Sequence, residues 1–127
     1  GSISLDPNDA LTWSNKGLAL DNQGKYDEAI EAYDEAIRLD PSLVGAWGNK
    51  GLALDDQCMY DEAIKAYDET IRVDPNCAVV WSNKGLALDH QGKYDEAIKA
   101  YDEAIRLDPN DALTWSNKGL ALDNQGK

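Results

Sequence analysis

The order of apolar and polar positions near the start of the chain predicts two helices joined by a short turn. In the first segment, Trp13, Gly17 and Leu20 recur at the spacing of one helical face. This spacing predicts a helix from about Ala10 to Gln23. We expect the helix to end at Gly24, because glycine readily adopts the left-handed conformation that terminates helices.

A second apolar stripe follows the turn and predicts a second helix, which begins near Asp27. Asp27 near its start and Arg38 near its end both suit the helix dipole. The helix ends before Asp40-Pro41, because the residue before a proline is pushed out of the helical region. Its inward stripe consists of Tyr26, Ala29, Ile30, Tyr33, Ala36 and Ile37.

The two-helix pattern recurs with a period of 34 residues, since the tryptophans lie at positions 13, 47, 81 and 115. A repeat of this length is one supersecondary unit that cannot bury its apolar face alone, so neighbouring units must stack. We therefore predict an all-α solenoid of about seven helices. The predicted units are residues 6–39, 40–73, 74–107 and a half unit, 108–127, whose single helix can cap the stack. Residues 1–5 are assigned to a tag scar and to the end of a preceding repeat.

The repeated residues resemble the tetratricopeptide repeat, whose pattern is W-x2-L-G-x2-Y, then A-x3-F, then P. The first unit reads Trp13-x2-Lys16-Gly17-x2-Leu20, then Ala29-x3-Tyr33, then Pro41. The resemblance covers nearly the whole chain and implies a right-handed superhelix whose first helices line a concave groove for extended peptides. One departure is a lysine in the usual leucine position, at 16, 50, 84 and 118. We expect its stem to pack and its ammonium to reach solvent.

A second stripe on each first helix faces this groove, because it is not used for packing. Its asparagines can pair with both the N–H and the C=O of an extended backbone. This arrangement is similar to the asparagine ladder of O-linked N-acetylglucosamine transferases. The alternative is that each asparagine bonds within its own hairpin or to the adjacent helix. The predicted peptide-binding residues are Asn15, Asn49, Asn83 and Asn117; Leu18, Leu52, Leu86 and Leu120; and Asp21, Asp55, Asp89 and Asp123, with Asp56 and His90 beside them.

Some members of this family bind the C-terminal tail of a chaperone through side chains of the same first helices. The carboxylate clamp that holds such tails requires lysines, asparagines and an arginine, whereas the matching residues here are Ser14, Leu18, Asn49, Val79 and Asn83. Only Asn49 agrees, and an acidic groove would repel the terminal carboxylate of the tail. We therefore expect that chaperone tails do not bind, and that the ligand is extended, partly apolar and basic.

Composition narrows the class of function further. The chain has 127 residues, with 24 Asp plus Glu against 12 Lys plus Arg and a net charge of −12. This acidity argues against nucleic acid and anionic membranes as partners, because their binders draw affinity from basic residues. No apolar run approaches the roughly twenty residues that span a bilayer. We expect a cytoplasmic protein.

No nucleophile, base or metal-ligating set stands outside the repeat, so we expect no enzymatic activity, no cofactor and no metal. His90 is the single histidine and lacks partners at ligand spacing. Cys58 and Cys77 lie at opposite ends of one predicted helix, about 21 Å apart, which is too far for a disulfide. Cys58 occupies the glycine turn position of the other units, so we expect it to be exposed and to oxidise between molecules.

The sequence thus predicts a non-enzymatic scaffold that binds an extended peptide or partner segment in a concave groove. Two alternatives stay open. One is a self-associating structural array, because the last helix lacks a hairpin partner and would expose Trp115 and Leu122. The other is a targeting domain within a larger protein.

Overall fold

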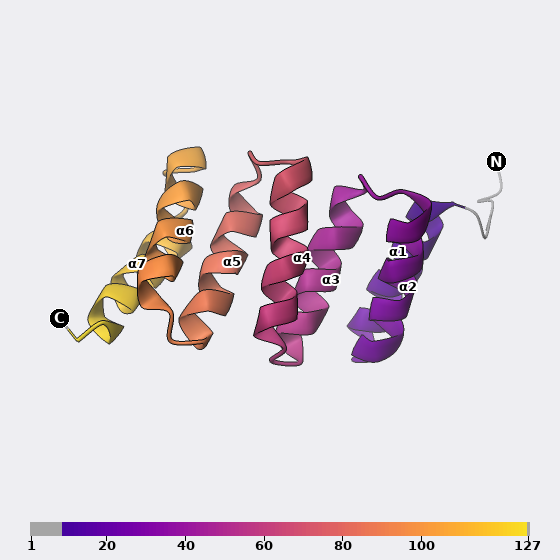
Figure 1. The fold of residues 1–127 in the computed structure, drawn as a ribbon, viewed down its shortest axis with the longest axis horizontal. Coiled ribbons are helices and arrows are strands. Elements are labelled where there is room, and N and C mark those ends of the chain that lie inside the picture. Colours follow the sequence, from indigo (N-terminus) through magenta and orange to yellow (C-terminus); the bar gives the residue numbers. More distant parts are fainter. Residues whose placement is uncertain (1–8, 127) are drawn as a thin grey trace.

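The computed structural model describes residues 9–126, which form a row of seven α-helices and no strand (Figure 1). The helices are α1 (Ala10–Asn22), α2 (Tyr26–Leu39), α3 (Val44–Asp56), α4 (Tyr60–Val73), α5 (Ala78–His90), α6 (Tyr94–Leu107) and α7 (Ala112–Asn124). The all-helical prediction is confirmed, and the predicted helices are shifted by only a residue at the ends where they differ. The assignment of residues 1–5 lies outside the described residues. None of the described helices has both the length and the apolar character needed to cross a bilayer.

Local sequence signals set the helix ends. Asp9 caps α1 by accepting a hydrogen bond from a backbone N–H of the first turn at 3.0 Å, and Asp111 caps α7 in the same way. The turn within the first and third hairpins has a φ of 77°, at Gly24 and Gly92. In the second hairpin Cys58 takes this place with a φ of 62°, so a side chain occupies a conformation that favours glycine. Cys58 is exposed, as predicted.

Each hairpin closes around a tyrosine ring from its second helix. Tyr33, Tyr67 and Tyr101 are fully buried. A Cβ placed on Gly51 would lie 2.5 Å from the ring of Tyr67, so glycine is required where the two helices approach. Ala29 and Ala36 are also buried, as the inward stripe predicts, whereas Tyr26, Ile30 and Ile37 of that stripe are half-buried. Ala32, which the predicted stripe did not include, is buried as well.

Two polar contacts join each hairpin to the preceding one. The ammonium of Lys84 in α5 lies 2.7 Å from Asp68 in α4 and also lies over the indole of Trp81, 5.5 Å from the ring centroid. Gln91 donates a hydrogen bond of 2.5 Å to Asp61 of the preceding hairpin. Both contacts recur at the other hairpin boundaries. Beyond the first hairpin the ammonium of each of these lysines pairs with an exposed aspartate of the preceding hairpin, a contact that the sequence did not predict.

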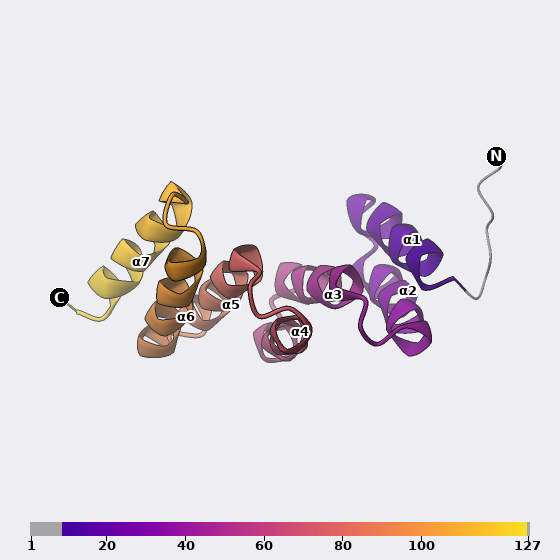
Figure 2. The same ribbon diagram turned by 90° about the horizontal axis from the view of Figure 1, so that it is seen from above.

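The two kinds of helix lie on different sides of the row. Among the described helices, α1 contacts α3, α3 contacts α5 and α5 contacts α7, whereas α2, α4 and α6 do not contact one another. The closer spacing of the first helices bends the row. Figure 2 shows this bend, with α1 and α7 displaced toward one side and α4 toward the other. The first helices therefore line the concave face of a solenoid.

Candidate functional site

The four predicted asparagines lie on the concave-side helices, one in each first helix. Asn15 is exposed, and Asn49, Asn83 and Asn117 are half-buried. None of their side-chain amides has a hydrogen-bond partner among residues 9–126. No bond from these amides to their own hairpin or to the adjacent helix is seen in the described part of the chain. Each amide keeps two donors and one acceptor oxygen available to a ligand.

An apolar row runs beside the asparagines. Leu18, Leu52 and Leu120 are exposed by 39%, 40% and 57%, and Leu86 is half-buried. Further exposed apolar side chains, Leu11, Val79 and Leu113, stand near the starts of α1, α5 and α7. The equivalent residue of α3 is Gly45, where an added Cβ would meet nothing within 4 Å. At this position α3 therefore offers no apolar side chain, unlike α1, α5 and α7.

The aspartate row is held by the buried tyrosines. Tyr67 donates a hydrogen bond of 3.2 Å to Asp55, and the same bond joins Tyr33 to Asp21 at 3.5 Å and Tyr101 to Asp89 at 3.3 Å. These carboxylates are half-buried. The sequence places them in the groove but does not reveal this contact, which fixes each carboxylate to the core of its own hairpin.

Acidic groups of neighbouring first helices act on one another. Burial, and next the negative charge of Asp56, raise the pKa of Asp21 above its ordinary value. Burial also raises the pKa of Asp55; Asp56 adds to this rise, while the tyrosine hydrogen bond and His90 oppose it. The ring of His90 lies 5.1 Å from that of Tyr60, centroid to centroid. Within residues 9–126 no three His, Cys, Asp or Glu side chains are grouped so as to hold a metal. The part of the concave face around Asp21, Asp55 and Asp56 is therefore suited to an ammonium or guanidinium group, whose positive charge would offset the repulsion between these carboxylates.

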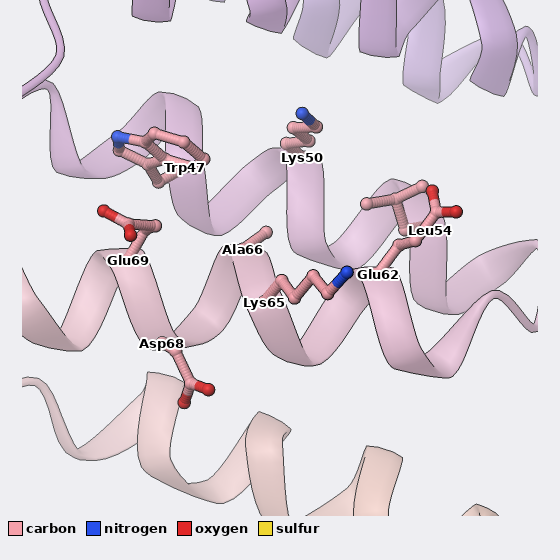
Figure 3. A pocket seen from close by; sticks show the side chains of 8 residues that line it. All are labelled: Trp47, Lys50, Leu54, Glu62, Lys65, Ala66, Asp68 and Glu69. Atoms are coloured by element: carbon pink, nitrogen blue, oxygen red, sulfur yellow. The ribbon is translucent and has the colours of Figure 1, made fainter.

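A second concavity, which the sequence analysis missed, lies on the face of the first helices opposite to the asparagines. In the second hairpin it is lined by Trp47, Lys50 and Leu54 from α3 and by Glu62 and Glu69 from α4 (Figure 3). Equivalent hollows lie in the first and third hairpins. Lys50 points away from α4 in Figure 3, so it leaves open the space that a leucine would fill. The lysine in an otherwise apolar stripe was the signal for this hollow.

The last helix presents the same residue pattern without a following helix in the described part of the chain. Trp115 and Leu122 are exposed by 49% and 40%, as predicted. Asp123 is exposed and receives no tyrosine hydrogen bond from the described residues. Tyrosine hydrogen bonds therefore hold the aspartates of the three hairpins, whereas Asp123 has no such bond from the described residues.

Comparisons with protein families agree with the repeat pattern. Three family models, each described as tetratricopeptide repeat, match residues 49–112, 10–43 and 100–127. The first of these spans half of the chain by itself. A comparison with curated proteins finds none that matches.

Solved structures share the whole arrangement. The first TPR of Spaghetti (RPAP3) bound to HSP90 peptide SRMEEVD is 25% identical, with a TM-score of 0.90 over 99% of this chain and 100% of that chain. The crystal structure of MamA is 28% identical, with a TM-score of 0.91 over 95% of this chain and 71% of that chain. The second TPR domain of human RPAP3 in complex with the HSP70 peptide SGPTIEEVD is 24% identical, with a TM-score of 0.85 over 88% and 93% of the two chains.

These neighbours do not support the sequence-based exclusion of chaperone tails, and they point the opposite way. Two of the three structures carry chaperone peptides on a backbone of the same shape. The five side chains at the clamp positions, including Ser14 and Val79, are only part of the concave face. The rest of that face offers a peptide other hydrogen-bond donors and apolar contacts.

Proposed function

The chain belongs to the tetratricopeptide repeat family, and on this basis we propose that it is a protein-interaction scaffold that holds an extended peptide in its concave groove. The asparagine row carries the proposal. Other repeated polar side chains, such as Tyr67, Trp81 and Lys84, are engaged with neighbours in the solenoid. The asparagines are the repeated concave-side amides that have no partner among residues 9–126. An amide that bonds both groups of a peptide unit recognises main chain with little regard for side-chain sequence.

The surroundings of the row suggest the character of the ligand. The exposed leucines favour apolar side chains along one edge of the peptide. Asp21, Asp55 and Asp56 place like charges close together along the other edge. A lysine or arginine of the ligand would relieve this repulsion. The net charge of −12 adds to the attraction and speeds encounter with a basic partner.

Binding of labelled peptides tests this proposal. We would compare two short, end-blocked peptides of equal leucine and threonine content, one with lysines and one with glutamates at the remaining positions, and the peptide SRMEEVD. The lysine peptide should bind at least about tenfold more tightly than the glutamate peptide, and its affinity should fall as salt screens the groove. Tighter binding of SRMEEVD than of the lysine peptide would contradict the basic character of the ligand.

A pair of asparagine variants separates groove binding from general attraction. Asn49→Ala/Asn83→Ala removes two amides, each worth about 0.5–1.5 kcal/mol, so the affinity for the lysine peptide should fall about tenfold. The matched control is Asn76→Ala/Asn110→Ala, in the exposed turns before α5 and α7. An equal loss in both double variants would mean that the groove amides do not bind the peptide.

A self-associating array is the second candidate, because Trp115 and Leu122 are exposed on the last helix. Light scattering after size exclusion, with a reductant and over a range of concentrations, tests it. A mass that grows with concentration would favour the array. A constant mass near 13.9 kDa would oppose it.

A further inference from the structure

The glycine at position 45 of α3 is not required by the fold. Gly24 has a positive φ, Gly51 lies under the ring of a buried tyrosine, and Gly48 faces the side chain of Thr70, 3.9 Å from an added Cβ. Gly45 belongs to a regular helix and is exposed, and a Cβ added there would meet nothing within 4 Å. Since glycine is also a poor helix former, neither packing nor backbone conformation accounts for its presence.

The other first helices carry an apolar side chain at this position. Leu11, Val79 and Leu113 are exposed by 56%, 65% and 66%. Because α3 contacts both α1 and α5, Gly45 interrupts the apolar row between Leu11 and Val79. The concave side of α3 therefore has open space where α1 and α7 carry a leucine.

The opposite end of α3 also differs from the other first helices. Asp55 is followed by a second aspartate, Asp56, whereas the equivalent residues at positions 22, 90 and 124 are Asn, His and Asn. Asp56 is exposed, and its negative charge acts on Asp21 and Asp55. The same helix therefore has open space near its start and two adjacent carboxylates near its end.

Asn49 lies between these two features. At 1.5 Å per residue it is about 6 Å along the helix from Gly45 and about 10 Å from Asp56. Its amide has no hydrogen-bond partner among residues 9–126. A peptide main chain that bonds this amide crosses α3, and consecutive side chains of an extended peptide point in opposite directions. One side chain then points toward Gly45 and the next toward the carboxylates.

We propose that α3 selects peptides in which an aromatic residue is next to an arginine, with the aromatic ring in the open space at Gly45 and the guanidinium group on Asp55 and Asp56. This inference rests on the proposed groove function and narrows its ligand. The ring packs between Leu11 and Val79 and buries more apolar surface than an aliphatic side chain does. Arginine suits the other end better than lysine, because its planar guanidinium group bonds carboxylate oxygens in pairs.

The probe is a short, end-blocked, fluorescently labelled peptide with a Phe-Arg pair set among threonines, which favour an extended chain. One control peptide has alanine in place of the phenylalanine. A second control peptide has the same composition but the order Phe-Thr-Arg, so that both side chains point in the same direction. The first control measures the effect of the ring, and the second measures the effect of its position relative to the arginine.

Two protein variants test the two ends of α3. Gly45→Leu fills the open space with the side chain that α1 and α7 carry at positions 11 and 113. It keeps the fold, because an added Cβ meets no neighbour and leucine favours a helix more than glycine does. Asp56→Asn removes one carboxylate and copies the asparagine at positions 22 and 124. Its matched control is Glu96→Gln, an exposed acid of α6 with the same loss of charge.

Fluorescence anisotropy should show that the original chain binds the Phe-Arg peptide at least about tenfold more tightly than either control peptide, since an aromatic anchor dominates such contacts. Gly45→Leu should lose this preference and bind the alanine peptide as the original chain does. Asp56→Asn should weaken binding of the Phe-Arg and alanine peptides about two- to fivefold, whereas Glu96→Gln should leave both affinities nearly unchanged.

The outcomes separate this inference from the groove function on which it rests. Equal binding of the Phe-Arg and alanine peptides, or undiminished binding of the Phe-Arg peptide by Gly45→Leu, would overturn the inference and leave the groove function standing. Equal binding of the Phe-Thr-Arg peptide would overturn the requirement that the two residues be adjacent. Absence of binding by all three peptides would overturn the groove function and this inference together.

Discussion

The Nζ atom of Lys50 lies 2.6 Å from Oδ1 of Asp34, across the boundary between the first and second hairpins. The same pair recurs at the next two boundaries, with Lys84 and Lys118 as the cations. Each pair ties one unit of the solenoid to the preceding unit, which is where such folds obtain their cooperativity. The lysine and aspartate side chains are 24% and 52% exposed, so solvent weakens each pair.

A double-mutant cycle on Lys84 and Asp68 measures this coupling. We expect Lys84→Met and Asp68→Asn to show a coupling free energy of about 0.2–1 kcal/mol in urea unfolding, falling as salt is added. The control is Lys16→Met, because among the described residues Lys16 contacts the Trp13 ring and no carboxylate. Coupling that is independent of salt would show that the pair acts through packing rather than charge.

The contact between glycine and tyrosine predicts opposite effects for one substitution at two equivalent sites. Gly85→Ala would place its Cβ 2.5 Å from the ring of Tyr101, and we expect it to lower the free energy of unfolding by about 1–3 kcal/mol. Gly119→Ala has open space, and we expect it to raise that free energy by about 0.5–1 kcal/mol. Chemical unfolding of both variants measures the difference. A stabilising Gly85→Ala would mean that the helices can separate freely.

The turn at Cys58 carries both a strained conformation and a reactive group. Its φ of 62° costs a side chain about 1–2 kcal/mol, so Cys58→Gly should raise the free energy of unfolding by about 1 kcal/mol. The same variant should abolish disulfide-linked dimers after air oxidation, because Cys58 is the exposed thiol. Non-reducing electrophoresis measures the dimer. Its persistence would assign the reactive thiol to Cys77, which is half-buried.

The parts of this fold that lie within one hairpin were predictable from sequence. Gly17 and Tyr33 recur in fixed register, and both the helical period and the turn glycine can be read from a single unit. The pairing of Lys84 with Asp68 was not predictable in this way. Each residue appears solvated on its own helix, and the pairing depends on how two hairpins are set against each other. The hydrogen bond from Tyr67 to Asp55 was not foreseen either, because it depends on how closely the two helices of one hairpin approach.

The raised pKa of Asp55 predicts how stability depends on pH. An aspartate whose pKa is higher in the folded state binds its proton more readily there, so its contribution to stability is full below its ordinary pKa and is lost as the pH rises through the raised value.

Asp55→Asn removes this loss of stability and keeps a hydrogen-bond acceptor for Tyr67. We expect the variant to be more stable near neutral pH, by no more than about 1 kcal/mol for a half-buried group, and the difference to vanish near pH 3. Thermal unfolding between about pH 3 and pH 7 measures this profile. Asp123→Asn, at the equivalent but exposed position of α7, is the matched control variant. An Asp55→Asn chain that is less stable at every pH would mean that the tyrosine bond to the ionised carboxylate outweighs the cost of its burial.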